Sequence, residues 1–380
     1  MTQIQMIDGK SNNIKYGRMY IGFELSNSKW KLSFGNGSKM RMKTIEARNI
    51  SDLEKEIEIA RQKLKMAEDA EIWSCYEAGR DGFWIHRQLE ALGIKNLVID
   101  PASIDTKRRA RNAKTDRIDA EKLLSCLMRY LNGEKRAFAV VHVPSAEEED
   151  IRRINREIKR LQKERTSHTN RIKSLLVLCG IIKEIGIGFL NDLEGLSQWD
   201  GNPVPPNIKA EIIREYRRYE LVKKHVEELE DKKKEVLKSL GNGADKALKL
   251  EQLKGVGPVS AWLMTFEFFG WREFKNIKQV GAAAGLTPTP HNSGDMVREQ
   301  GISKSGNKRV RATMIELSWL WLRYQPESRI TIWFNERFAT AGKRMRRIGI
   351  VAVARKLLVA LWKYLEKGMI PEGAILKANA

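Results

Sequence analysis

Two groups of residues in this chain have the types and spacing that chemistry on a phosphodiester would need. Asp116 and Asp119 stand three residues apart at the end of a cationic run, 107–117. Far along the chain, Ser293 lies in a short glycine-containing loop that precedes several more cations. Carboxylates among cations indicate metal ions acting on a polyanion, and a serine among cations indicates a hydroxyl that attacks phosphorus.

Four carboxylates are candidate metal ligands. Glu24 ends the first predicted strand, Glu77 ends a later strand, and Asp116 and Asp119 share one face of a predicted helix. Two-metal chemistry needs several carboxylates at one place, because each Mg²⁺ takes mostly oxygen ligands. Acids on a first strand, a later strand and a final helix are the layout of an RNase H-like nuclease. The alternative is two helix-start acids favoured by the helix dipole plus two surface glutamates.

Ser293 has a simpler alternative as well, because serines before glycine commonly sit in turns. Its neighbourhood favours a nucleophile, since an exposed hydroxyl needs cations that bind the phosphate and stabilise charge in the transition state. Ser303 and Ser305 are rival serines, and reasoning from the residues alone does not choose between the three. The candidate cations are Arg298, Lys304, Arg309 and Arg311.

A third group of residues would hold a nucleic acid rather than cut it. Gly255 and Gly257 resemble the turn of a helix-hairpin-helix motif, in which glycines let backbone N–H groups approach a phosphate. The alternative is a plain turn between two helices. The cations beside the aspartates are further phosphate-binding candidates: Arg108, Arg109, Arg111, Lys114 and Arg117.

The composition is that of a folded, strongly basic protein. The 380 residues are enough for two or three domains, and 69 Lys and Arg against 48 acids give a formal charge of +21. Such an excess points to a nucleic-acid partner. Three widely spaced cysteines argue against disulfides and a zinc site and are predicted to be small core residues. No apolar stretch reaches about 18 residues, so we expect no membrane partner.

The elements that must position these residues begin with an α/β pattern. Strands alternate with helices after an initial three-strand meander, which predicts an α/β domain with a mixed sheet. Ser51 and Glu54 have the spacing of a capping box for the first helix. The predicted strands are 19–25, 29–34, 40–47, 71–76 and 96–100, and the predicted helices are 52–66, 82–93 and 116–131.

The rest of the chain is predicted to be all-α. Apolar residues at three- and four-residue spacing predict two long coiled-coil helices, from about 151 and over 208–240, that form an antiparallel hairpin. Residues 245–380 are mostly helical around a loop at 286–306. Trp319, Trp321, Trp333 and Trp362 are expected in the core. Outward cations of the hairpin form either a solvated face or a contact with nucleic acid or a subunit: Arg152, Arg156, Lys159, Lys163, Lys223 and Lys232.

Taken together, these motifs resemble one family, the DEDD transposases of insertion sequence family 110, and within it the 1111 branch. The resemblance covers nearly the whole chain in order. It implies a RuvC-like, RNase H-like domain at 1–145, a coiled-coil middle at 146–244 and a helical C-terminal transposase domain at 245–380. The segments that carry it are 21–26, 75–84, 108–124, 285–295 and 300–304.

The resemblance also assigns roles to residues. It makes Glu24, Glu77, Asp116 and Asp119 the ligands of Mg²⁺, although the family's first acid is commonly aspartate and this chain has a glutamate. It makes Ser293 the nucleophile ahead of the rival serines, because Ser293 stands in the Ser-Gly pair of the motif.

The implied function is an RNA-guided DNA recombinase that moves its own insertion sequence through a phosphoseryl-DNA intermediate. Its implied partners are donor and target DNA, a structured non-coding bridge RNA and further copies of the chain, as a dimer or tetramer. We expect a cytoplasmic prokaryotic protein that is nucleoid-associated when active. Two alternatives stay open: a RuvC-like structure-specific nuclease without a covalent intermediate, and a non-catalytic nucleic-acid-binding protein.

Overall fold

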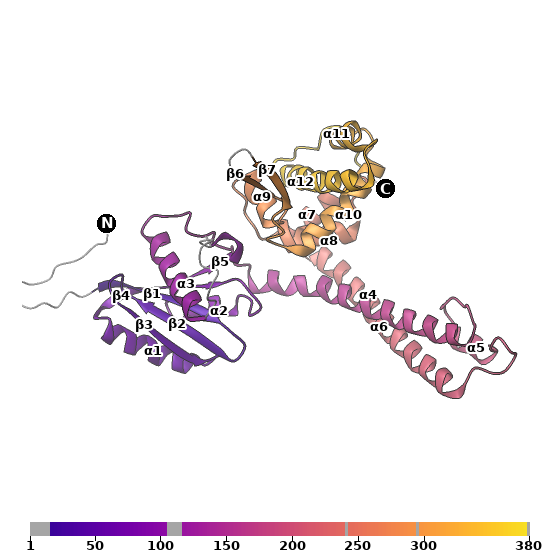
Figure 1. Ribbon diagram of the computed structural model, residues 1–380, viewed down its shortest axis with the longest axis horizontal. Helices are drawn as coiled ribbons and strands as arrows, with labels where there is room; N and C mark the ends of the chain where they lie inside the picture. Colours follow the sequence, from indigo (N-terminus) through magenta and orange to yellow (C-terminus); the bar gives the residue numbers. More distant parts are fainter. Residues whose placement is uncertain (1–15, 105–115, 240–241, 294–295, 378–380) are drawn as a thin grey trace, which may run out of the picture. The chain divides into compact units, whose positions relative to one another are not determined.

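The computed structural model describes residues 16–104, 116–239, 242–293 and 296–377. The chain folds into two compact units, Met1–Pro144 and Ser145–Ala380. The first unit is built on a β-sheet and the second on helices (Figure 1). None of the helices in the described ranges is both long and apolar enough to cross a membrane.

A five-stranded mixed sheet forms the centre of the first unit. Its strands are β1 (Tyr16–Leu25), β2 (Lys29–Gly35), β3 (Met40–Glu46), β4 (Met66–Glu77) and β5 (Lys95–Ile99). They lie in the order β3-β2-β1-β4-β5. The first three pair antiparallel, whereas β4 is parallel to β1 and β5 is parallel to β4. The predicted mixed sheet is confirmed, with β4 beginning five residues earlier than expected.

Helices cover both faces of this sheet. Successive strand residues point to opposite faces, and the two resulting cores are distinct. Phe23 packs on one face with Leu53 and Ile85, whereas Cys75 packs on the other with Leu123. The helices that supply these residues are α1 (Ile50–Lys63) and α2 (Trp84–Ala91) on the first face and α3 (Asp116–Leu131) on the second, and a short 3-10 turn η1 (Pro101–Ser103) follows β5.

The start of α1 corrects one prediction from the sequence. The N-cap is Asn49, whose side-chain oxygen accepts the backbone N–H of Asp52 at 3.1 Å. Ser51 therefore lies inside the helix and is not its cap. Asparagine and serine are comparable N-cap residues, so the sequence offered two equivalent starting points two residues apart.

Two long helices form an antiparallel hairpin in the second unit, as predicted. They are α4 (Ala146–Leu178) and α6 (Pro206–Ser239), with α5 (Phe189–Glu194) in their connection. The end of α4 packs on the start of α6 through Ile172 and Ile212, and Ile158 packs with Val226 further along. Ser145 caps α4 in a capping box with Glu148.

Two of the α4 cations predicted to face outward are instead covered. Arg152 is only 5% exposed, and its guanidinium lies 4.8 Å from the centre of the Trp271 ring. Arg156 makes an ion pair of 2.6 Å with Glu267, which is 1% exposed. The spacing of apolar residues predicts only which side of α4 faces α6. A segment distant in the sequence also packs on α4 and covers these two cations.

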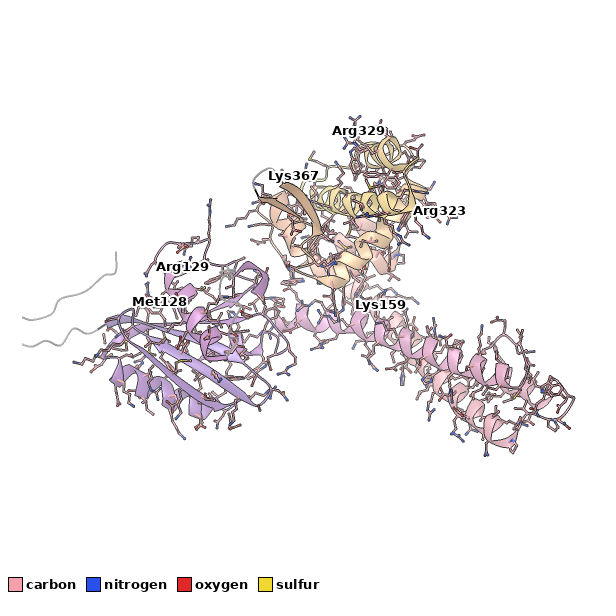
Figure 2. The ribbon with its side chains drawn as sticks, viewed as in Figure 1. Met128, Arg129, Lys159, Arg323, Arg329 and Lys367 are labelled. Carbon is pink, nitrogen blue, oxygen red and sulfur yellow. The ribbon has the colours of Figure 1, made fainter. Side chains whose placement is uncertain are left out.

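That segment is the π-helix η2 (Thr265–Phe269), which follows α8 (Pro258–Met264). Trp262 of α8 and Phe266 of η2 join the apolar core between α4 and α6. The other predicted outward cations of the hairpin are accessible: Lys159 (Figure 2), Lys163 and Lys232 are exposed, and Lys223 is half-buried.

The remaining helices pack into a second core around α12. Trp321 and Trp362 are buried there as predicted, but Trp319 is 44% exposed and Trp333 is half-buried. Neighbouring positions on α10 point in different directions, so Trp319 cannot share the buried face of Trp321. These helices are α7 (Asn242–Glu251), α9 (Ile277–Ala283), α10 (Lys308–Tyr324), α11 (Arg329–Phe338) and α12 (Lys343–Lys367).

The stretch 286–306 contains a β-hairpin where the sequence predicted a loop. Its strands are β6 (Pro288–Ser293) and β7 (Met296–Ile302). The base of the hairpin is held between two glycines with left-handed backbones. A Cβ at Gly285 (φ 66°) would lie 2.0 Å from the carbonyl oxygen of Ser305, and one at Gly306 (φ 99°) would lie 2.4 Å from that of Ala283. Both positions therefore require glycine.

The division into domains at 1–145, 146–244 and 245–380 stays a prediction. The second compact unit includes both the helical hairpin and the segments after it, because α8 and η2 pack directly on α4 and α6.

We predict that Arg156→Ala lowers the free energy of unfolding by about 3–5 kcal/mol at pH 7, because it leaves the buried carboxylate of Glu267 without its partner. Burial alone would raise the pKa of Glu267, but hydrogen bonds and the charge of Arg156 lower it. In the wild type the pair's contribution is therefore lost as the pH falls through this lowered pKa. In the variant, burial raises the pKa and acid relieves the penalty, so the difference between the two proteins should shrink near pH 4.

Urea denaturation at pH 7 and pH 4 measures this difference. Arg160→Ala is the matched control, because Arg160 is an exposed arginine on the same helix that pairs only with exposed glutamates. It should change stability by no more than about 0.5 kcal/mol. Equal losses in the two variants would contradict a buried pair.

A second prediction concerns the hairpin base. Gly285→Ala should destabilise the protein by at least about 2 kcal/mol more than Gly301→Ala, because its Cβ would overlap a backbone carbonyl. Gly301 is the matched control, since it also has a left-handed backbone (φ 84°) but nothing within 4 Å of the added Cβ. Thermal and urea denaturation of both variants test this, and similar losses would show that the steric contact is relieved cheaply.

Candidate active site

The two glutamates predicted as metal ligands lie side by side at one edge of the sheet. β1 and β4 are parallel, and their register pairs Phe23 with Tyr76. Glu24 and Glu77 follow these residues, so both come near the carboxyl ends of neighbouring parallel strands. Both line a surface cavity of about 380 Å³. Glu24 is half-buried and Glu77 is exposed.

Both glutamates face the side of the sheet that α3 covers. A Cβ at Gly22 would lie 2.9 Å from the backbone nitrogen of Leu124, and the Cys75 thiol donates a 3.5 Å hydrogen bond to the carbonyl of Leu123. Side chains two residues apart on a strand share a face, which places Glu24 with Gly22 and Glu77 with Cys75. Burial raises the pKa of the Cys75 thiol, and the charge of Glu77 adds to the effect.

The direction of α3 brings Asp119 toward the same edge. The hydroxyl of Ser33 donates to the carbonyl of Ala120 at 2.7 Å, and the side chain of Leu124 reaches Gly35. Gly35 pairs with Tyr20 of β1, and Ser33 pairs with Gly22. Going back along α3 from Leu124 to Ala120 therefore leads toward the carboxyl end of β1. Asp119, the preceding residue, is half-buried in the first turn of the helix.

Asp116 is the first residue of α3, and its side chain lies outside the described atoms. The structure thus gathers Glu24 and Glu77 and directs Asp119 toward them. Among the described side chains, no three His, Cys, Asp or Glu residues converge closely enough to hold a metal ion. The complete four-acid set is therefore still a prediction.

A fifth carboxylate, which the sequence analysis did not single out, also lines the cavity. Asp81 makes ion pairs with Arg48 at 3.3 Å and Arg80 at 3.6 Å. Arg48 also donates to the backbone carbonyl of Asn27, and so it joins the turn after β1 to the loop after β4. Arg48 has a left-handed backbone (φ 67°), which sequence patterns do not indicate for an arginine.

Most of the cations predicted to bind nucleic acid beside the aspartates, and Arg298 of the hairpin, have side chains outside the described atoms. Four of them lie outside the described residues: Arg108, Arg109, Arg111 and Lys114. Arg117 belongs to α3 and Arg298 to β7, but their side chains are likewise outside the described atoms. Their role stays a prediction.

Ser293 is the last residue of β6, where the backbone pairs it with Met296. This position is at the turn end of the hairpin, whereas the rivals Ser303 and Ser305 lie at its base. Ser303 is held there by a backbone hydrogen bond from its N–H to the carbonyl of Thr287 at 2.8 Å. The side chain of Ser293 lies outside the described atoms, so the structure places its backbone alone.

The other predicted cations near this hairpin differ in their exposure and in their hydrogen bonds. Lys304 and Arg309 are exposed, and Lys304 has a left-handed backbone (φ 56°). Arg311 is half-buried and donates to the backbone carbonyl of Ala284 at 3.2 Å. Arg311 therefore has a structural contact in addition to any phosphate it binds.

The predicted helix-hairpin-helix turn connects α7 to α8. Gly255 has a left-handed backbone (φ 90°), and Gly257 is the N-cap of α8. The buried amide of Gln325 donates to the carbonyl of Lys254 at 2.7 Å and to that of Ile375 at 2.8 Å. This amide fixes the turn against the C-terminal segment of the chain. Binding of phosphate by these glycines stays a prediction.

Comparisons with known proteins identify two family matches. Residues 247–331 match the family model described as the transposase IS116/IS110/IS902 family. Residues 37–181 match a second model, that of the DEDD transposases of IS110. The second match ends three residues after α4 and contains Glu77 and Asp119, and the first contains the hairpin with Ser293.

Several named relatives align along most of the chain. The Sinorhizobium fredii protein named "Putative transposase y4rJ" is 42% identical over 380 residues, which is 96% of each chain. The transposase for insertion sequence element IS1111A of Coxiella burnetii is 25% identical over 74% of each chain. The transposase for IS1328 of Yersinia enterocolitica is 23% identical over 75% of this chain and 80% of its own. The chain therefore belongs to the IS110 family of insertion-sequence transposases.

Proposed function

We propose that this transposase cuts and rejoins DNA with a divalent-cation site in its first unit and a serine nucleophile in its second. The observation that carries the proposal is the placement of Glu24 and Glu77 at adjacent strand ends, on the face that α3 covers. The order of the five strands, with α3 behind β1 and β4, is also the order expected of a RuvC-like, RNase H-like nuclease.

The donor set fits Mg²⁺. Glu24, Glu77, Asp116 and Asp119 offer only carboxylate oxygens, which this hard cation prefers. Transposases of the DEDD type, whose family model this chain matches, generally use divalent metal ions. Mg²⁺ held by these acids would neutralise charge on the scissile phosphate. The packing of α3 on the sheet would keep the acids oriented before DNA arrives.

Ser293 would then act as the nucleophile. Its hydroxyl oxygen forms a bond to phosphorus, the bond from phosphorus to a deoxyribose oxygen breaks, and the serine proton passes to that departing oxygen. The phosphodiester is exchanged for another phosphodiester, so a second DNA hydroxyl can reverse the step and release serine. Arg298, whose backbone pairs with that of His291 close to Ser293, would stabilise charge on this phosphate. Lys304 and Arg309, which are exposed at the base of the hairpin, would bind the DNA backbone further from Ser293.

The proposal includes guidance by a structured bridge RNA and action as a dimer or tetramer. These two elements are supported by the resemblance to the family and by the net charge of +21, which suits a chain that binds more than one nucleic acid.

We predict that Asp119→Asn abolishes recombination while the fold and nucleic-acid binding persist. The change keeps the size of the side chain but removes a negative charge that Mg²⁺ needs. A plasmid recombination assay measures the loss, and circular dichroism checks the fold. Asp69→Asn is the matched control, because Asp69 is exposed on β4 well before its carboxyl end. Normal recombination by Asp119→Asn would exclude Asp119 from the metal site.

We predict that Ser293→Ala eliminates both recombination and any protein–DNA adduct that survives detergent. The substitution removes one oxygen, so stability should change by no more than about 0.5 kcal/mol. Labelled DNA on a denaturing gel reports the adduct. Ser303→Ala and Ser305→Ala are the matched controls and should retain it. Loss of the adduct in a control variant but not in Ser293→Ala would reassign the nucleophile. Unimpaired cleavage by all three variants would favour a plain metal-dependent nuclease.

A further inference from the structure

The strongest concentration of unpaired positive charge in the described chain lies at the start of α12. Four of the first five residues of this helix are cations: Lys343, Arg344, Arg346 and Arg347. Residues 329–365, which include α11 and most of α12, contain nine Lys or Arg and a single acid, Glu336. Within the described residues, the structure records no ion pair to any of the four cations.

This segment is exposed along its whole length. Every residue from 342 to 348 is exposed, including the apolar Met345 and Ile348, which are 47% and 48% exposed. A helix that packs on its own protein buries one face. Residues 343–348 of α12 have no buried member, so no described segment of the chain covers them. At about 100° per residue, the four cations spread over roughly 160° of the helix circumference.

The charges are also unfavourable to the helix itself. Like charges three and four residues apart repel, as in the pairs of Lys343 with Arg346 and Arg344 with Arg347. Cations at a helix N-terminus oppose the helix dipole, and the Gly342 cap supplies no side-chain hydrogen bond. A polyanion lying on this surface would remove both penalties.

The preceding helix, α11, packs closely against α12 just after these exposed residues. α11 ends at Phe338, and the four residues 339–342 lead to α12. A Cβ at Gly349 would lie 2.7 Å from the Phe338 ring and 2.9 Å from the Phe334 ring, so the two helices approach as closely as glycine allows. Figure 1 shows α11 next to α12 at the end of the second unit. The exposed start of α12 thus belongs to a helix that packs closely against α11.

We propose that α11, its four-residue turn and α12 form a helix-turn-helix-like element whose basic α12 start, residues 343–347, docks in the major groove of duplex DNA. A short glycine-containing turn between two helices is the connection found in such elements, and their second helix enters the major groove. That groove in B-form DNA is wide enough for an α-helix, whereas the major groove of an A-form RNA duplex is too narrow. A helix exposed on every side fits the major groove of B-form DNA.

This inference rests on the proposed function only in taking DNA as the substrate. It requires neither the metal site nor the serine. Its test therefore reads binding and not cleavage, so that a failed nucleophile assignment and a failed docking assignment give different results.

The test is a salt titration of binding by the full-length protein to a mixed-sequence DNA duplex of about 30 base pairs, followed by fluorescence anisotropy. The variant Arg344→Gln/Arg346→Gln/Arg347→Gln should weaken binding at least tenfold. It should also reduce the slope of log K against log salt by about 2 to 3, since each lost phosphate contact removes about 0.9. Its melting temperature should be unchanged or higher, because like-charge repulsion is relieved.

The matched control is Arg160→Gln/Lys224→Gln/Lys234→Gln, which removes three exposed helical cations that have acidic partners. It should leave the slope within about 1 of the wild-type value. An equal effect of the control would attribute the loss to net charge and overturn the proposal. So would an unchanged slope in the α12 variant, or an equal loss on an RNA duplex of the same length.

Discussion

The close contact between α3 and the sheet is the constraint on which the first unit's site depends. Gly22 has no side chain, and its backbone lies so near the backbone of Leu124 that a Cβ would not fit without movement. The Ser33 hydroxyl then fixes the sliding position of the helix through Ala120. Together these contacts set which face Glu24 occupies and how far the first turn of α3 reaches. The position of these acids is therefore set by backbone contacts at neighbouring residues and not by the acids themselves.

Much of the fold of the first unit can be predicted from the sequence, because its strands and turns are determined by residues close together in the chain. Alternating apolar residues and short polar turns fix the strands, and the parallel pairing of β1 with β4 brings their carboxyl ends to one edge. The position of Glu24 beside Glu77 was therefore predictable from the strand ends. The part played by Asp81 and Arg48 was not, because their ion pair joins two loops and depends on a left-handed arginine backbone.

The second unit shows where such patterns fail. A seam of apolar residues predicts which positions of α4 and α6 meet, but it contains nothing about a third segment that packs on them. η2 brings the buried Glu267 against α4, so the half-buried Arg156 becomes its partner and Arg152 lies against an aromatic ring. The prediction of a loop at 286–306, where the structure has β6 and β7, was wrong for a related reason. Its strands are short, and its base is defined by glycines that oppose carbonyls from elsewhere in the chain.

These cases bear on how a net charge of +21 should be interpreted. A cation that neutralises a buried acid, such as Arg156, or that donates to a backbone carbonyl, as Arg311 does, has an interaction that a nucleic acid would have to replace. A cation that is exposed among other cations lowers its own free energy when a phosphate approaches. The two kinds look alike in the sequence and differ in the fold. The residues most suited to a polyanion are therefore those whose present surroundings are electrostatically unfavourable, and in the described chain these gather at the start of α12.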